Sequence, residues 1–178
     1  MQLSIIYYQL SITLSVQDKQ ITNSSEISEI LLLPDKGRII ALDLGTSKIG
    51  VAVCDELQIT VRPLQIIKRK TWKELLKQII SLIEEFDAIA LVLGLPYNFD
   101  GTECEMSIEA RRLQRNFSLS LKIPIFLQDE RLTSKSAQQN LHDRGFTMDE
   151  IAKLIDNEAA AIILEDFISL KEEMRKRQ

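Results

Sequence analysis

Residues 38 to 54 read RIIALDLGTSKIGVAVC, and this stretch decides the fold. Its first part, RIIALDL, is a nearly continuous apolar run, which is typical of a strand buried at the centre of a sheet. The turn-forming segment GTSK separates it from a second apolar run, IGVAVC. The stretch therefore predicts a β-hairpin.

Strand and helix signals alternate after this hairpin. Pro63 confines the third expected strand to a sheet edge or a bulge, and Thr71 and Glu74 have capping-box spacing before an amphipathic pattern. The expected elements are a strand at 59–67, a helix at 72–86, a strand at 88–93, a helix at 105–120, a strand at 123–128, a helix at 133–144 and a last helix after 147. The order βββαβαβ, followed by helices, predicts an α/β fold with a mixed five-stranded sheet and helices on both faces.

The composition is that of an ordinary globular protein. Hydrophobic residues make up 45% of the 178 residues and charged residues 27%, which excludes a mainly disordered or collagen-like chain. The net charge of -4 argues against a protein that coats nucleic acid through its overall field. Any binding of a polyanion would therefore need a local basic patch.

The sequence also suggests a compartment and a domain organisation. Cys54 and Cys104 fit neither a disulfide framework nor a zinc site, and no signal peptide or membrane span is evident, so a cytoplasmic protein is expected. Residues 37–170 are expected to form one domain, and 171–178 a charged C-terminal tail. Residues 1–36 form an N-terminal extension of unknown role, which could be ordered, a flexible tail, or translated from an upstream start codon.

Acidic residues occur where buried or packed elements are predicted. Asp43 lies inside the most apolar strand, where a carboxylate needs a cation or hydrogen bonds to compensate its burial. Asp129 and Glu130 directly follow the last strand, and one of them is expected to face the same edge as Asp43. Asp156 shares a face of the last helix with apolar residues such as Ile163.

Each acid also has a purely structural explanation: backbone hydrogen bonds for Asp43, a surface ion pair for the Asp-Glu-Arg tripeptide, and solvation for Asp156. Their convergence favours a site for hard divalent cations such as Mg²⁺ or Mn²⁺. Two such ions about 4 Å apart would orient an attacking water and stabilise the leaving oxygen of a phosphodiester. Such a site needs no histidine, and the single His142 is expected to be an exposed polar residue.

Four motifs resemble those of the YqgF family, which is described as pre-16S ribosomal RNA nucleases and Holliday-junction-resolvase-like proteins. The motifs are ALDLGTSKIGVAV at 41–53, LVLGLPYNFDGTE at 91–103, LQDERLTS at 127–134 and KLIDNEAAAIIL at 153–164. Their order and separations agree with the family as well. The resemblance covers residues 37–170.

The resemblance implies a ribonuclease H-like fold and a metal-dependent nuclease, a hydrolase of ester bonds. It implies Asp43, Glu130 and Asp156 as the catalytic, metal-binding acids, with Mg²⁺ or Mn²⁺ as cofactor. The substrate that it favours is the 5′ end of pre-16S ribosomal RNA during ribosome biogenesis, and the alternative is branched DNA. The protein would act as a monomer or homodimer and away from membranes.

Several polar residues are candidates for contacts with the nucleic-acid substrate. They are Lys48, Asn98, Arg111, Arg112, Arg115 and Arg131. Lys48 stands where members of the family often have arginine, and a lysine would meet a phosphate as a point charge. The arginines of the 105–120 helix could equally solvate an exposed face. Asp100 could be a further metal ligand or could cap its own Asp-Gly turn.

Two other classes of function compete with a nuclease. Asp-Leu-Gly-Thr at 43–46 also opens the phosphate loop of actin-like and sugar-kinase-like ATP-binding modules, but those proteins need two lobes and this chain has residues for one. A catalytically silent assembly factor could bind RNA through the same surface. The intact set of acids favours the nuclease.

Overall fold

The computed structural model of the chain describes residues 24–98, 100–130 and 148–177, and for 24–26 and 148–157 it describes the backbone alone. The chain divides into two compact units, Met1–Leu33 and Pro34–Gln178. In the first unit the described element is helix α2, Ser24–Leu32. The functional roles of 1–36, 37–170 and 171–178 stay predictions.

The second unit is built on one five-stranded sheet. Its strands are β1 (Arg38–Leu44), β2 (Lys48–Cys54), β3 (Val61–Lys68), β4 (Ala88–Leu95) and β5 (Ile125–Asp129). They lie in the order β3-β2-β1-β4-β5, where β1 pairs with β2 antiparallel and with β4 parallel. The predicted central hairpin is therefore confirmed. Strand β3, which contains Pro63, lies at an edge as predicted, and its pairing with β2 is irregular between Gly50 and Ala52.

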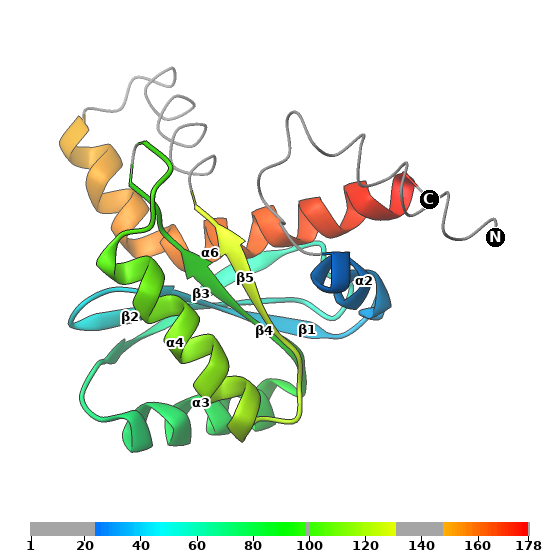
Figure 1. Cartoon of the computed structure of the whole chain (residues 1–178), viewed down its shortest axis with the longest axis horizontal. Coiled ribbons are helices and arrows are strands. Elements are labelled where there is room, and N and C mark those ends of the chain that lie inside the picture. The colour runs from blue at the N-terminus through cyan, green and yellow to red at the C-terminus, as the bar shows by residue number, and fades with distance from the viewer. Residues whose placement is uncertain (1–23, 99, 131–147, 178) are drawn as a thin grey trace. The chain divides into compact units, whose positions relative to one another are not determined.

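Helices cover both faces of this sheet. They are α3 (Trp72–Phe86), α4 (Glu105–Ser120) and α6 (Met148–Lys176). Figure 1 shows α3 and α4 on one face and α6 running across the other. This arrangement confirms the predicted α/β fold class, a mixed five-stranded sheet with helices on both faces. The predicted helix at 133–144 and His142 lie outside the described residues.

Thr71 is the N-cap residue of α3, as its spacing from Glu74 indicated. The Thr71 hydroxyl oxygen accepts a hydrogen bond from the Glu74 backbone N–H at 3.2 Å, and the hydroxyl donates to the Glu74 carboxylate at 3.0 Å. The first bond satisfies a free backbone N–H at the helix start. No described helix is both long enough and apolar enough to span a membrane.

The alternation of side chains along β1 assigns a face to each of its residues. Ile40, Leu42 and Leu44 belong to the core formed with α3 and α4. The intervening residues Ile39, Ala41 and Asp43 must point to the face that α6 covers, because successive side chains of a strand alternate. Asp43 therefore lies between the sheet and α6.

A buried lysine anchors the C-terminal part of α6. Lys171 is 3% exposed, and its Nζ donates hydrogen bonds to the backbone oxygen of Pro34 at 2.8 Å and to the side-chain oxygen of Gln58. The Gln58 side-chain nitrogen in turn donates to the Gly37 carbonyl at 3.0 Å. Residue 171, which the sequence analysis assigned to a charged tail, thus ties α6 to the β2–β3 turn and to the segment before β1.

Replacing this lysine should destabilise the protein. Lys171→Ala should lower the free energy of unfolding by about 1–3 kcal/mol, because Gln58 would keep a buried oxygen without its donor. Lys176→Ala is the matched control, since Lys176 is exposed and lies 3.7 Å from Glu172 in a surface ion pair. That control should change stability by less than about 0.5 kcal/mol. Urea denaturation measures both, and equal effects would contradict the anchoring role.

Candidate active site

Asp43 stands in a row of the sheet whose neighbouring positions carry no side chain. Its cross-strand partner on β2 is Gly50. On β4, Leu93 pairs with Leu42, so the following residue, Gly94, lies beside Asp43. The sheet positions on both sides of Asp43 are therefore glycines, whose missing side chains leave room for groups from other elements.

Helix α6 lies directly over this row. A Cβ placed on Gly50 would lie 3.4 Å from the Cβ of Asp43 and 3.5 Å from the Cβ of Ala160. Ala160 is 4% exposed, and its small side chain lets the helix approach the sheet closely. The carboxylate of Asp43 thus lies in a narrow layer between β1, β2 and α6.

Glu130 reaches the same layer from the end of β5. Its backbone N–H donates to the carbonyl of Leu95 at 3.3 Å, which continues the β4–β5 pairing by one residue. A Cβ placed on Gly94 would overlap the Glu130 carboxylate and would lie 2.7 Å from Cδ1 of Ile163 on α6. The Glu130 side chain therefore lies across Gly94, the residue next to Asp43.

The electrostatics of Glu130 reflect this crowding. Its pKa is raised to about 8, first by burial, then by the negative charge of Asp43, and then by that of Asp129. Like charges held together in a poorly solvated site favour the protonated form of one of them. Of the two acids at the end of β5, Glu130 is thus the one on the face with Asp43 and α6, while Asp129 is buried as the last residue of the strand.

These carboxylates fit a hard divalent cation. Oxygen ligands are those that Mg²⁺ and Mn²⁺ prefer, and a cation would offset the repulsion that raises the pKa of Glu130. Within the described residues, no group of three or more His, Cys, Asp or Glu side chains is arranged to hold a metal. A pair of carboxylates is in place, and a further ligand would complete the site.

The third predicted acid, Asp156, lies in α6, and its side chain is outside the described part of the chain. Its position is one helical turn before Ala160, so both residues share a helix face. Ala160 lies beside Gly50. Asp156 thus lies one helical turn from a residue of this layer, and its part in the site stays a prediction.

The sequence analysis did not identify Gly50 and Gly94 as parts of the site. A signal was present, because a glycine inside a strand often marks the close approach of a ligand or of another segment. Which of the glycines mattered depended on the strand register, which places these two beside Asp43.

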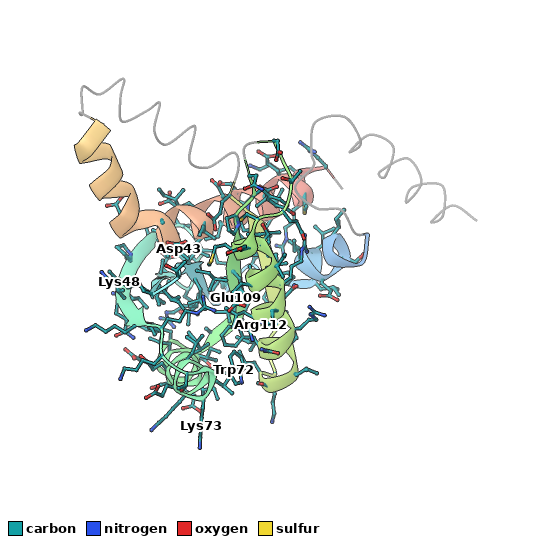
Figure 2. The ribbon with its side chains drawn as sticks, turned by 60° about the vertical axis from the view of Figure 1, so that its left-hand side comes forward. Asp43, Lys48, Trp72, Lys73, Glu109 and Arg112 are labelled. Atoms are coloured by element: carbon teal, nitrogen blue, oxygen red, sulfur yellow. The ribbon has the colours of Figure 1, made fainter. Side chains whose placement is uncertain are left out.

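Lys48, the first residue of β2, is exposed and lies two residues before Gly50 on the same strand. Its cross-strand partner on β3 is another lysine, Lys68. Figure 2 shows Lys48 on the same side of the molecule as Asp43 in that view. Arg131, the other basic candidate beside the acids, lies outside the described residues.

Asn98 and Asp100 hold the loop after β4 in place. The Asn98 amide donates to the hydroxyl of Thr102 at 3.0 Å, and the Asp100 carboxylate accepts from the Thr102 backbone N–H at 2.9 Å. Hydrogen bonds from Thr102, that of its side chain first, lower the pKa of Asp100. This geometry favours the self-capping turn for Asp100 over a role as a metal ligand.

The structure does not bring the arginines of α4 to the acids. Arg111 pairs with Glu103 at 2.5 Å. Arg112 pairs with Glu109 through contacts of 2.6 and 2.8 Å, and both of these residues are labelled in Figure 2. Arg115 is exposed on the same helix. Because α4 covers the face opposite α6, these arginines and the Asp43–Glu130 pair belong to opposite faces of the sheet.

Known proteins resemble this chain over the second unit. A family model described as "RuvX: Holliday junction resolvase" matches residues 37–170. A protein of Anaeromyxobacter sp. (strain Fw109-5) is 34% identical over 131 residues, which cover 74% of this chain and 96% of that protein. A protein of Rickettsia bellii (strain OSU 85-389) is 34% identical over 139 residues, which cover 78% and 90%. Both are named "Putative pre-16S rRNA nuclease".

Solved structures also align with the chain. The yeast mitochondrial Holliday junction resolvase Ydc2 aligns with a TM-score of 0.47 and 10% identity, covering 88% of this chain and 89% of that one. Thermus thermophilus RuvC in complex with a Holliday junction aligns with a TM-score of 0.46 and 12% identity, covering 75% and 94%.

A divalent cation should stabilise the folded protein through these carboxylates. At about 100 times its dissociation constant, Mn²⁺ should contribute about 2.7 kcal/mol and raise the melting temperature by about 5–10 °C. Glu130→Gln should remove most of this shift, because the amide carries no negative charge. Differential scanning fluorimetry with and without Mn²⁺ measures the effect, and an unchanged shift in the variant would contradict the assignment of Glu130.

Without metal, Glu130→Gln should stabilise the folded protein at alkaline pH. The pKa of Glu130 is higher in the folded protein than its ordinary value of 4.5, so folding stability is lost as the pH rises from about 4.5 to about 8. In metal-free buffer at alkaline pH, Glu130→Gln should therefore melt at a higher temperature than the wild type. Below the ordinary pKa this difference should vanish, and a constant difference across the pH range would contradict the effect of burial and charge.

Gly94→Ala should disrupt the site sterically. The added methyl group would overlap the Glu130 carboxylate, which must move, and such overpacking costs about 1–3 kcal/mol. The variant should melt at a lower temperature and lose the Mn²⁺-dependent shift. Gly50→Ala is the matched control for stability, because its methyl group would meet ordinary contacts of 3.4 Å or more. Equal melting temperatures for the two variants would contradict this packing.

Proposed function

The chain belongs to the RuvX family, and we propose that it is a metal-dependent nuclease that processes the 5′ end of precursor 16S ribosomal RNA. The family model matches residues 37–170, the same range as the YqgF resemblance, which is thereby confirmed. Membership makes the chain a nuclease, a hydrolase of ester bonds. The choice of RNA is supported by relatives named as pre-16S rRNA nucleases, which it covers over 90% or more of their length. Such a role would be carried out in the cytoplasm.

The observation that carries the proposal is the pair of carboxylates beneath α6. The Glu130 carboxylate lies across Gly94, the residue next to Asp43, and the charge of Asp43 adds to burial in raising the pKa of Glu130. We assign both as metal ligands, with Asp156 completing the set from α6. A divalent cation bound there would neutralise negative charge on the scissile phosphate as hydrolysis proceeds.

The protein residues would prepare the site for this reaction. Asp43 is fixed by the pairing of β1 with strands on both sides, so its carboxylate is carried by a strand at the centre of the sheet. Glu130 is fixed by backbone pairing with Leu95. Lys48, on the strand that pairs with β1, would hold a substrate phosphate near these acids, and Arg131 is proposed for the same role.

The second candidate function is cleavage of branched DNA. The description of the matching family model as a Holliday junction resolvase favours it. The same carboxylates could serve either substrate, because both reactions hydrolyse a phosphodiester bond. A resolvase would be expected to act as a dimer with two equivalent sites, whereas processing of one RNA end needs a single site.

The test is cleavage of two substrates in parallel by the full-length protein. A precursor 16S ribosomal RNA end and a four-way DNA junction would be incubated with Mg²⁺ or Mn²⁺, and with EDTA as a control. The RNA should be cut at its 5′ end and the junction should be cut poorly. Asp43→Asn should lower the rate by about 100-fold or more, because a lost metal ligand removes several kcal/mol of transition-state stabilisation.

Three outcomes would count against the proposal. Selective cleavage of the junction by a dimer would favour the DNA reaction. Equal cleavage by the wild type and by a folded Asp43→Asn protein would remove Asp43 from the site. Tight RNA binding without cleavage under any metal condition would favour the silent assembly factor.

A further inference from the structure

A strongly basic segment lies outside the acid site. Residues 68–77, KRKTWKELLK, contain five Lys or Arg and a single Glu, in a chain whose net charge is -4. The segment spans the end of β3, the following linker and the first turns of α3. It is therefore a local basic patch of the kind that an acidic protein needs in order to bind a polyanion.

Part of this segment lines a groove on the surface. The groove has a volume of about 590 Å³ and runs between the edge strand β3 and α3. Its charged lining residues are Lys68, Lys70, Lys77 and Glu74. The groove is thus lined by three positive charges and one negative charge.

The lysines of the groove have no acidic partner among the described residues. No salt bridge within the described ranges involves Lys68, Lys70 or Lys77, and all three are exposed. The single carboxylate of the groove, that of Glu74, accepts a hydrogen bond from the hydroxyl of Thr71, the N-cap residue of α3. The positive charge of the groove is therefore available to a ligand.

Hydrogen bonds fix this patch beside the turn that follows Asp43. The backbone N–H of Arg69 donates to the carbonyl of Ser47 at 3.0 Å, and its guanidinium donates to the carbonyl of Gly45 at 3.3 Å. Arg69 also pairs with Glu109 of α4. Lys68 and Lys70, which flank Arg69, are thereby held next to the β1–β2 turn.

The strand register gives the separation between the groove and the acids. Asp43 pairs with Gly50, and Gly50 pairs with Ile66, which lines the groove. Two inter-strand spacings amount to about 10 Å. In the view of Figure 2, Lys48 lies between Asp43 above it and Lys73 of α3 below it. The basic surface therefore begins within a few nucleotides of the site.

We propose that Lys68, Lys70 and Lys77, continued towards the acids by Lys48, form a binding track for the sugar-phosphate backbone of the nucleic acid that flanks the scissile bond. This inference rests on the proposed function, and it adds the path that the substrate follows as it leaves the site. The track runs from the β1–β2 turn along the edge strand β3 to α3. Its contacts are to phosphates, so it positions the substrate and does not read its sequence.

The chemistry of the groove favours a nucleic-acid backbone. Trp72, the aromatic residue of the segment, packs against Phe117 with ring centroids 4.9 Å apart, so it is not presented for stacking on bases. Lysines on an edge strand also protect against edge-to-edge association, but Lys70 and Lys77 lie beyond β3. Protection of the edge therefore does not account for the whole cluster.

The experiment compares three variants in an Asp43→Asn background, where cleavage does not deplete the probe. The first carries Lys68→Gln, Lys70→Gln and Lys77→Gln. The matched control removes the same charge elsewhere through Lys36→Gln, Lys122→Gln and Lys176→Gln, all at exposed positions. The third replaces the groove lysines with arginine. Fluorescence anisotropy measures binding of a labelled precursor 16S RNA end across a range of salt concentrations, and thermal melts check folding.

The groove variant should bind about tenfold or more weakly at moderate salt, and the slope of log affinity against log salt should fall by about 2–3. The control should bind like the background protein, and the arginine variant should restore both affinity and slope. With the native Asp43, the groove variant should raise KM and leave kcat within about twofold, because the lysines do not touch the reacting atoms.

Equal losses in the groove variant and the control would overturn the track, because they would reflect net charge alone. Failure of arginine to restore binding, or self-association of the glutamine variant with an unchanged salt slope, would overturn it as well. The two proposals fail separately. If the protein with native Asp43 cleaves nothing but the groove variant loses RNA binding, the track is retained and the nuclease is rejected. If the protein cleaves RNA but the groove variant binds as tightly as the background protein, the nuclease is retained and the track is rejected.

Discussion

Two carboxylates share the thin layer between the sheet and helix α6, and the arrangement of the rest of the unit accommodates them. Burial in this layer, together with the negative charges of Asp43 and Asp129, raises the pKa of Glu130 to about 8. Gly50 and Gly94 leave the adjacent positions of the sheet empty, and Ala160 lets the helix pass close above. The fold accepts this electrostatic cost where a bound cation would offset it, which is how strain at a functional site is usually compensated.

An acidic site and a polyanionic substrate set opposite electrostatic requirements. The acids attract cations, but they repel a nucleic acid until a cation is bound, and the net charge of the chain adds to that repulsion. Positive charge must therefore lie close to the acids without neutralising them. The β3–α3 edge meets this need, because Arg69 hydrogen-bonds to the turn after Asp43 while Lys68 and Lys70 stay exposed. The hydrogen bonds of Arg69 to this turn thus hold the positive charges of Lys68 and Lys70 near the acids but separate from them.

The sequence predicted those features that local patterns determine. The hairpin of β1 and β2 followed from apolar runs and turn residues, and an acid within such a run marked Asp43 as unusual. The face of Glu130 followed less directly, because it depends on which residues of β5 point to α6. The placement of Gly94 beneath Glu130 could not be predicted, since it requires the register of β1, β4 and β5, which lie far apart in the sequence. Pairing between distant strands is set by packing as a whole.

The basic residues show the same distinction between composition and placement. The arginines of α4 and the lysines at 68–77 look alike in the sequence, since both are clusters of positive charge within or beside an amphipathic helix. Helix α4 joins the adjacent parallel strands β4 and β5, and the handedness of such a crossover fixes the face that it covers. That face is opposite α6, and Glu103 and Glu109 already pair with Arg111 and Arg112. Topology and local neutralisation, which the count of charges does not reveal, therefore decide which basic residues can reach a substrate at Asp43.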